Sequence, residues 1–322
     1  MEVSTTKGLG SAIKVCASLV KAVGPLLLSQ FDYSKFKYLD FKTKQAQSAG
    51  YAEYLLAEAR TLVEIKAEQT RESFKKTGLE RLQSEQNIKL ISKEINKLLV
   101  YSKVPAHISY PEGDKEPLES NTADDSIEIN ETWLDRFNDL ASKLNEEWRQ
   151  NILAKSFVLE AENPGTIGLD TLFTIAQLDQ KSFYFFDAIL SISLKLYEVF
   201  FLPLEKGTLE IIVNVNGTEH DIGNIIYQLK HTGLLIHEEG LGANLSPGKL
   251  VQFRYDNDVL AAIPSEQVHF AGIMTSRSGS ALATLCTINP NEIGVEIFHS
   301  FEEVLVQNNS LYKRYSVTEE QK

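Results

Sequence analysis

The chain has 322 residues, of which 43% are hydrophobic and 24% are charged, and its formal net charge is −12. This composition is typical of a folded protein of two or three domains and excludes a wholly disordered chain. Its two cysteines, Cys16 and Cys286, form no CxxC pair and no Cys/His cluster. The sequence therefore argues against a disulfide scaffold or a zinc finger, and we expect no metal or other cofactor.

Charge is divided unevenly along the chain. Residues 1–103 hold 17 Lys/Arg against 11 Asp/Glu, a net charge of +6, whereas residues 104–322 hold 15 against 33, a net charge of −18. Such an asymmetry is informative about partners. The basic half could meet an anionic surface, such as lipid headgroups or nucleic acid, or it could meet the acidic half of the same or another copy, which we favour.

Residues 9–28 form the most apolar stretch, and their pattern predicts an amphipathic helix that breaks at Gly24-Pro25. Lys14 and Lys21 interrupt the apolar run, so it reads neither as a membrane span nor as a signal peptide. Two alternatives stay open: the helix packs into the protein's own bundle, or it lies at a membrane surface or oligomer interface. The residues that would make the membrane or oligomer contact are Leu9, Ile13, Lys14, Leu19, Val20, Lys21 and Val23.

A long helical arm is predicted from Lys44 to Tyr101, because this stretch has no proline and is rich in Ala, Glu, Gln, Lys and Leu. We expect one long helix or two helices broken near Gly78. The middle of the arm is too polar for a core helix, which is typical of an exposed arm or a coiled coil. The arm therefore predicts a protein partner or a homo-oligomer.

Residues 104–127 contain three prolines among acidic and polar residues, and this composition predicts a flexible acidic linker. A central helical bundle follows. Asn130 is expected to cap its first helix, a second helix begins near Glu147, a third near Leu169, and a fourth covers residues 179–201. The aromatic residues of the fourth helix are expected to pack in a core.

The first part of this bundle resembles the signature block of an uncharacterised bacterial family, a domain of unknown function. The matching positions are Trp133, Phe137, Glu146, Trp148, Ile152, Leu153, Ala154, Pro164, Gly165, Thr171 and Leu172. The resemblance extends over most of residues 44–290, and the helix with Arg81, Gln83 and Gln86-Asn87-Ile88 is similar to an upstream helix of the family. The chain departs from the family at Lys155-Ser156, where an acidic residue is common, and Glu160 comes later.

Relatives of this family are reminiscent of abortive-infection and other phage-defence proteins. The resemblance therefore implies a role in defence, and it implies no catalytic residue.

In the C-terminal part, Leu209 to Val215 predicts a strand, and Asn216-Gly217 predicts a hairpin turn. Asp221 is expected to cap a helix that ends at Gly233. Strands at 234–237 and 250–255 would follow, and this order is the layout of a winged helix. Residues 181–322 hold 10 Lys/Arg against 17 Asp/Glu, so we do not expect this unit to bind DNA.

No catalytic or metal site emerges from the remaining motifs. His231 and His237 lie near Glu238 and Glu239, but this spacing alone is weak support for a metal site. Asp256-Asn257-Asp258 begins like a calcium loop and lacks the later Gly and Glu. We therefore expect a protein that is not an enzyme.

The predicted fold is mainly α with a C-terminal α+β winged-helix-like unit. The predicted parts are the N-terminal helix and arm at 1–103, the linker at 104–127, the bundle at 128–206 and the α+β domain at 207–322. We expect a cytoplasmic protein, with peripheral contact at the inner membrane left open. The first hypothesis for its function is a non-enzymatic defence effector, and the alternatives are a protein-interaction scaffold and, third, a nucleic-acid regulator.

Overall fold

The computed structural model describes residues 15, 18, 41–108, 129–236 and 242–317. The chain divides into two compact units, residues 1–176 and 177–322. The protein is mainly helical with a sheet in its C-terminal part, as the sequence predicted. This division places the fourth predicted helix of the bundle in the second unit. The four predicted domain ranges stay predictions.

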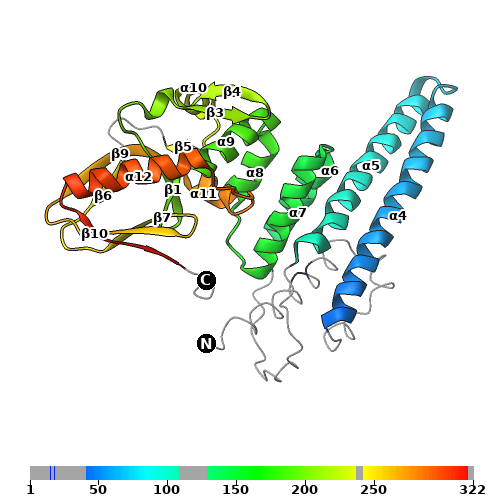
Figure 1. The fold of residues 1–322 in the computed structure, drawn as a ribbon. Coiled ribbons are helices and arrows are strands. Elements are labelled where there is room, and N and C mark those ends of the chain that lie inside the picture. The colour runs from blue at the N-terminus through cyan, green and yellow to red at the C-terminus, as the bar shows by residue number, and fades with distance from the viewer. Residues whose placement is uncertain (1–14, 16–17, 19–40, 109–128, 237–241, 318–322) are drawn as a thin grey trace. The chain divides into compact units, whose positions relative to one another are not determined.

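The first unit begins with a helical hairpin. Helices α4 (Phe41–Ser73) and α5 (Gly78–Lys103) lie side by side, as Figure 1 shows. Of the two alternatives left open for this stretch, the structure has two helices, and the second begins at Gly78, whose φ of +56° is a left-handed conformation that glycine adopts without steric cost. A short 3-10 helix η1 (Val104–His107) then contains Pro105, which fits the first turn of a helix because it has no N–H to leave unpaired.

Three shorter helices complete the first unit: α6 (Glu131–Lys143), α7 (Glu147–Glu162) and α8 (Leu169–Gln177). The Asn130 side chain accepts hydrogen bonds from the N–H groups of Thr132 and Trp133, so the predicted cap is confirmed. The core is aromatic. The rings of Trp133 and Phe137 stack at 5.1 Å, and Phe157 lies 5.3 Å from Phe137.

The second unit is built on an antiparallel sheet with the strand order β10-β8-β7-β1-β2-β9-β5, in which β6 also pairs with β9. A separate hairpin, β3-β4, lies outside this sheet. The strands are β1 (Leu194–Leu196), β2 (Val199–Pro203), β3 (Ile212–Val215), β4 (Thr218–Asp221), β5 (Leu235–Ile236), β6 (Gly242–Leu245), β7 (Val251–Tyr255), β8 (Asp258–Ala262), β9 (Val268–Thr275) and β10 (Leu311–Ser316). The helices are α9 (Gln180–Ile192), η2 (Thr208–Glu210), α10 (Ile222–Leu229), α11 (Arg277–Ala283) and α12 (Glu292–Gln307).

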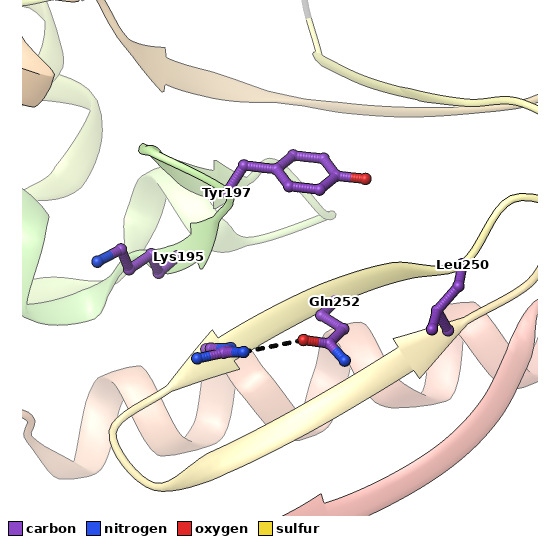
Figure 2. A pocket seen from close by; sticks show the side chains of 5 residues that line it. Lys195, Tyr197, Leu250 and Gln252 are labelled. Carbon is purple, nitrogen blue, oxygen red and sulfur yellow. Dashed lines mark hydrogen bonds between the residues drawn. The ribbon is translucent and has the colours of Figure 1, made fainter. Parts of the chain in front are cut away.

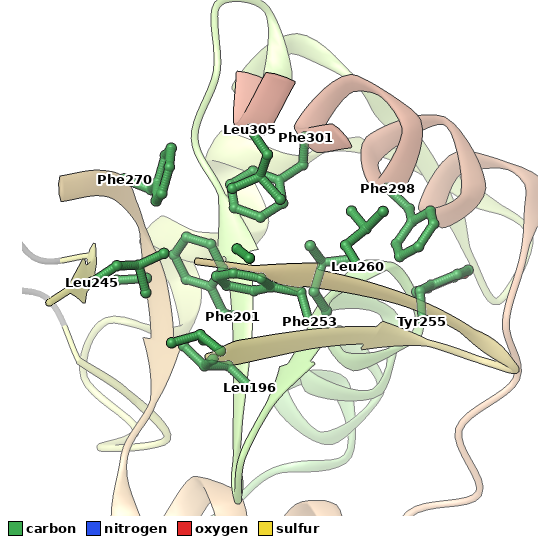
Figure 3. Close-up of a cluster of buried hydrophobic side chains, with 14 residues drawn as sticks. Leu196, Phe201, Leu245, Phe253, Tyr255, Leu260, Phe270, Phe298, Phe301 and Leu305 are labelled. Carbon is green, nitrogen blue, oxygen red and sulfur yellow. The ribbon is translucent and has the colours of Figure 1, made fainter. Parts of the chain in front are cut away.

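Helix α12 covers one face of the sheet (Figure 1). Phe298, Phe301 and Leu305 of α12 pack against the strand side chains that face this helix. Figure 3 shows this cluster of buried side chains. The Phe301 ring lies 4.8 Å from Phe253 in an edge-to-face arrangement, which aromatic pairs prefer. Because the strands alternate, the residues between these core positions lie on the opposite face.

The fourth predicted helix is too long. Helix α9 ends at Ile192, and residues 194–203 form the hairpin β1-β2 instead. The local sequence permits both patterns, because its apolar residues are dense enough for a helix. The sheet decides the outcome: Leu194 and Leu196 enter the core, and β1 pairs with β7, which lies about 55 residues later in the chain.

The predicted winged helix is not confirmed. The Asn216-Gly217 hairpin and the Asp221 cap both form, and the Asp221 carboxylate accepts a 2.7 Å hydrogen bond from Asn224 N–H. The two strands expected to make the wing do not pair with each other, however. Strand β5 pairs with β9, and β7 pairs with β1 and β8. These long-range pairings cannot be read from the order of local elements.

Candidate anion-binding face

The N-terminal residues predicted to contact a membrane or an oligomer partner lie outside the described residues. These are Leu9, Ile13, Lys14, Leu19, Val20, Lys21 and Val23. The structure describes only Val15, which is buried, and Ser18 in that segment. The predicted contact therefore stays a prediction.

The signature residues of the first unit are mostly buried. Trp133, Phe137, Leu153, Thr171 and Leu172 are in its core. Trp148 is half-buried, and the guanidinium of Arg149 lies 5.1 Å from the centre of its ring. Pro164 and Gly165 form the turn after α7, where Gly165 has a φ of +92°.

Glu160 links two of these signature positions, Gly165 and Trp133, through the turn after α7, and the sequence did not single it out for this role. Its side chain is buried, and its carboxylate accepts hydrogen bonds from the backbone N–H groups of Gly165 at 2.7 Å and Ile167 at 2.9 Å. The indole N–H of Trp133 donates to the carbonyl of Ile167 at 2.7 Å. Glu160 and Trp133 thus hold the turn that leads into α8, so the signature is structural.

The second unit carries a different feature on the sheet face opposite α12. The outward positions of β1, β7 and β10 hold Lys195, Gln252, Arg254, Lys313 and Tyr315. We call this surface the open basic face, and it includes Tyr197 and Leu250 at its rim. Lys195, Tyr197, Leu250, Gln252 and Arg254 line a hollow of about 330 Å³ (Figure 2).

Two cations of this face are directly opposed. Lys195 on β1 pairs in register with Arg254 on β7. Side chains opposite each other on one face of an antiparallel pair have Cβ atoms about 5 Å apart, and like charges there destabilise the sheet. Within the described residues, neither of these cations nor Lys313 forms an ion pair with a carboxylate.

Neutral groups surround these cations. Arg254 donates from Nη2 to the side-chain oxygen of Gln252 at 3.0 Å, and Gln252 donates to the Tyr315 hydroxyl at 2.9 Å. The ammonium group of Lys313 lies 5.9 Å from the centre of the Tyr315 ring. This network orients the side chains of the face, and it contains no carboxylate among the described residues.

Arg314 provides a comparison within the same strand. It follows Lys313 on β10 but lies on the α12 face, where its guanidinium pairs with Glu302 at 2.8 Å and Asp258 at 3.3 Å. The unit is acidic and supplies carboxylates to this exposed arginine on the α12 side of the sheet. Among the residues that the structure describes, the cations of the open basic face therefore differ locally from Arg314 in having no such carboxylate partner.

Tyr197, in the β1-β2 turn, adds a backbone feature. Its φ is +55°, a left-handed conformation that is unusual for a bulky residue, and its side chain is 67% exposed. Glycine or asparagine would be expected at such a position. Backbone strain of this kind is concentrated at ligand-binding and other functional sites.

A second hollow, of about 570 Å³, lies between α9, the β3-β4 turn and the start of α12. It contains Tyr184, Asp187 and several asparagines, and burial raises the pKa of the Asp187 carboxyl. In the described part of the chain, no group of three His, Cys, Asp or Glu side chains is placed to hold a metal ion. His231 is described and His237 is not, so their predicted proximity is untested.

Comparison with protein-family models gives a match. A family model described as "Protein of unknown function (DUF2806)" matches residues 116–293, more than half of the chain. The chain belongs to this family. The matched range contains the signature residues of the first unit and Lys195, Tyr197, Gln252 and Arg254 of the open basic face. Lys313 lies beyond the match to this family.

No curated protein and no solved structure matches the chain. Among the helices that the structure describes, none is both long and apolar enough to cross a bilayer.

Proposed function

We propose that this protein is a non-enzymatic binding protein and that its open basic face holds an anionic partner. The observation that carries the proposal is the register pair of Lys195 and Arg254, neither of which forms an ion pair with a carboxylate of the described residues. Like charges directly opposite each other on neighbouring strands lower the stability of a sheet, so this pair reduces the free energy of unfolding. An anionic partner placed between them converts this repulsion into attraction.

The strained Tyr197 supports the same conclusion. Its exposed ring borders the hollow that Lys195 and Arg254 line, so two features that are unfavourable for stability meet at one place. Residues that lower the stability of the fold are often found at functional sites, including binding surfaces.

Charge reversal tests this proposal. Lys195→Glu and Arg254→Glu should each weaken retention of the full chain on an immobilised polyanion such as heparin. Lys230→Glu is the matched control, because Lys230 is exposed in the same unit at the end of α10, outside the open basic face. Equal retention of all four proteins would overturn the proposal.

The family resemblance supports a second candidate, a role in phage defence through the N-terminal residues. Deleting residues 1–30 should then abolish protection of cells that express the protein. Undiminished protection by the truncated chain would reject an effector role for that segment. Binding to the open basic face is independent of this outcome, because residues 1–30 are not part of the second unit.

A further inference from the structure

We infer that the anionic partner of the open basic face is a single-stranded nucleic acid. This inference rests on the proposed function and names the ligand class for the same site. Three properties of the face support it: the extent of its positive charge, the exposed aromatic ring beside that charge, and the polar amide between them.

The positive charge extends across the sheet. Lys195, Arg254 and Lys313 stand on β1, β7 and β10, and in the sheet the order of these strands is β1-β7-β8-β10. Strands lie about 4.8 Å apart, so β1 and β10 are separated by roughly 14 Å. A row of cations over this distance suits a ligand with several regularly spaced charges. A small anion could contact only the Lys195–Arg254 end.

The exposed ring distinguishes a nucleic acid from other polyanions. Tyr197 lines the same hollow as Lys195, and Figure 2 shows its ring extending away from the Lys195 side chain, on the side of Gln252 and Leu250. Proteins that bind single strands combine a basic groove along the phosphates with aromatic side chains on which bases stack. An acidic peptide or a sulfated sugar has no base to stack on this ring. The left-handed backbone at Tyr197 is then explained because it holds the ring out from the sheet, where a base can stack on it.

Unpaired bases also fit the shape of the site. The hollow of about 330 Å³ is lined by Leu250 and the Gln252 amide as well as by the two cations. Apolar and amide groups of this kind can contact the face and the edge of a splayed base. In a duplex the base faces are stacked inside the helix and are not accessible to Tyr197.

This inference departs from the expectation, drawn from net charge alone, that the unit does not bind DNA, and that net charge limits the affinity. Residues 181–322 hold 10 Lys/Arg against 17 Asp/Glu, so long-range attraction of a polyanion is weak. We expect modest binding that depends on salt. With three phosphate contacts on a single strand, the logarithm of the binding constant should fall with the logarithm of salt concentration with a slope of about −2.

The test is fluorescence anisotropy of a labelled oligothymidylate with the full chain, at several salt concentrations. Tyr197→Leu should weaken oligonucleotide binding about tenfold, because one stacked base is lost, and should change heparin binding little. Tyr227→Leu is the matched control, since Tyr227 is a similarly exposed tyrosine on α10, outside the face. Lys195→Gln should weaken binding of both polyanions and reduce the steepness of the salt slope by about 0.7.

The outcomes separate this inference from the proposed function. One outcome is that heparin, polyglutamate or anionic vesicles bind at least as well as the oligonucleotide, and that Tyr197→Leu weakens binding of neither these polyanions nor the oligonucleotide. The nucleic-acid inference is then overturned and the anion-binding proposal stands. If a duplex of the same sequence binds as tightly as the single strand, the inference is also overturned. If no polyanion binds, both are overturned.

Discussion

Tyr197 illustrates how one residue can reduce stability at the proposed binding surface. A left-handed backbone costs a non-glycine residue about 1–2 kcal/mol, and glycine removes that cost while adding about 0.5–1 kcal/mol of unfolded-state entropy. Tyr197→Gly should therefore raise the free energy of unfolding by roughly 0.5–1 kcal/mol in urea titrations. Tyr312, an equally exposed tyrosine within β10, is the control, because Tyr312→Gly should destabilise the sheet. A loss of stability in Tyr197→Gly would show that the ring packs favourably.

Glu160 has the opposite role, since its side chain stabilises the fold. Glutamine offers one acceptor oxygen where the carboxylate offers two, so Glu160→Gln should remove the acceptor either of the part-buried Gly165 N–H or of the buried Ile167 N–H. We expect a loss of about 2 kcal/mol in unfolding free energy, measured by chemical denaturation. Glu162→Gln, at a less buried position near the end of the same helix, should change stability little. Equal stability of both variants would contradict the assigned role of Glu160.

Helix α9 gives a pH-dependent prediction at its N-terminus. The Asp179 carboxylate accepts hydrogen bonds from Ser182 N–H at 2.8 Å and Ser182 Oγ at 2.9 Å. The backbone hydrogen bond from Ser182 holds the pKa of Asp179 below its usual value. Folding is therefore stabilised above the ordinary pKa of aspartate, and this stabilisation is lost as the pH falls through the lowered pKa of the folded state.

Two substitutions separate the cap from its charge. Asp179→Ala should cost about 1 kcal/mol at neutral pH, whereas Asp179→Asn should keep most of the cap. Urea unfolding over an acidic pH series should show the advantage of the native chain over Asp179→Ala shrinking below about pH 4, the ordinary range of aspartate. An advantage that stays constant with pH would contradict this role of the carboxylate.

The helical hairpin belongs to the first unit and presents an apolar tip. Phe74 is 78% exposed, Leu79 70% and Leu82 58%, all near the turn between α4 and α5. Exposed apolar clusters of this kind are typical of interaction surfaces. These exposed side chains are consistent with the sequence-based prediction of a homo-oligomer or a protein partner. The hairpin tip itself lies outside residues 116–293, which the family model matches.

Light scattering on the full chain tests self-association through this tip. We expect an assembly larger than a monomer, and the double variant Phe74→Ser, Leu79→Ser should shift it toward the monomer. Leu90→Ser removes a comparably exposed leucine farther along α5 and should have no such effect. A strict monomer at high concentration would reject self-association.

Across the whole molecule, the sequence by itself determined the local features, namely helix caps and turns, that depend on residues close together in the chain. The Asn130 and Asp221 caps and the Asn216-Gly217 turn were predicted correctly, because each is fixed by side chains within a few positions. The break near Gly78 was one of the two alternatives that the sequence left open. The resemblance of the signature block also follows from local sequence, and the family match supports it.

Only the tertiary structure decided the order of strands in the sheet. The pairing of β1 with β7 turned the end of a predicted helix into a strand and separated the two strands of the predicted wing. It also brought Lys195 opposite Arg254, which are 59 positions apart in the sequence. Strand pairing depends on which distant segments bury each other's apolar side chains, and no local pattern encodes that choice.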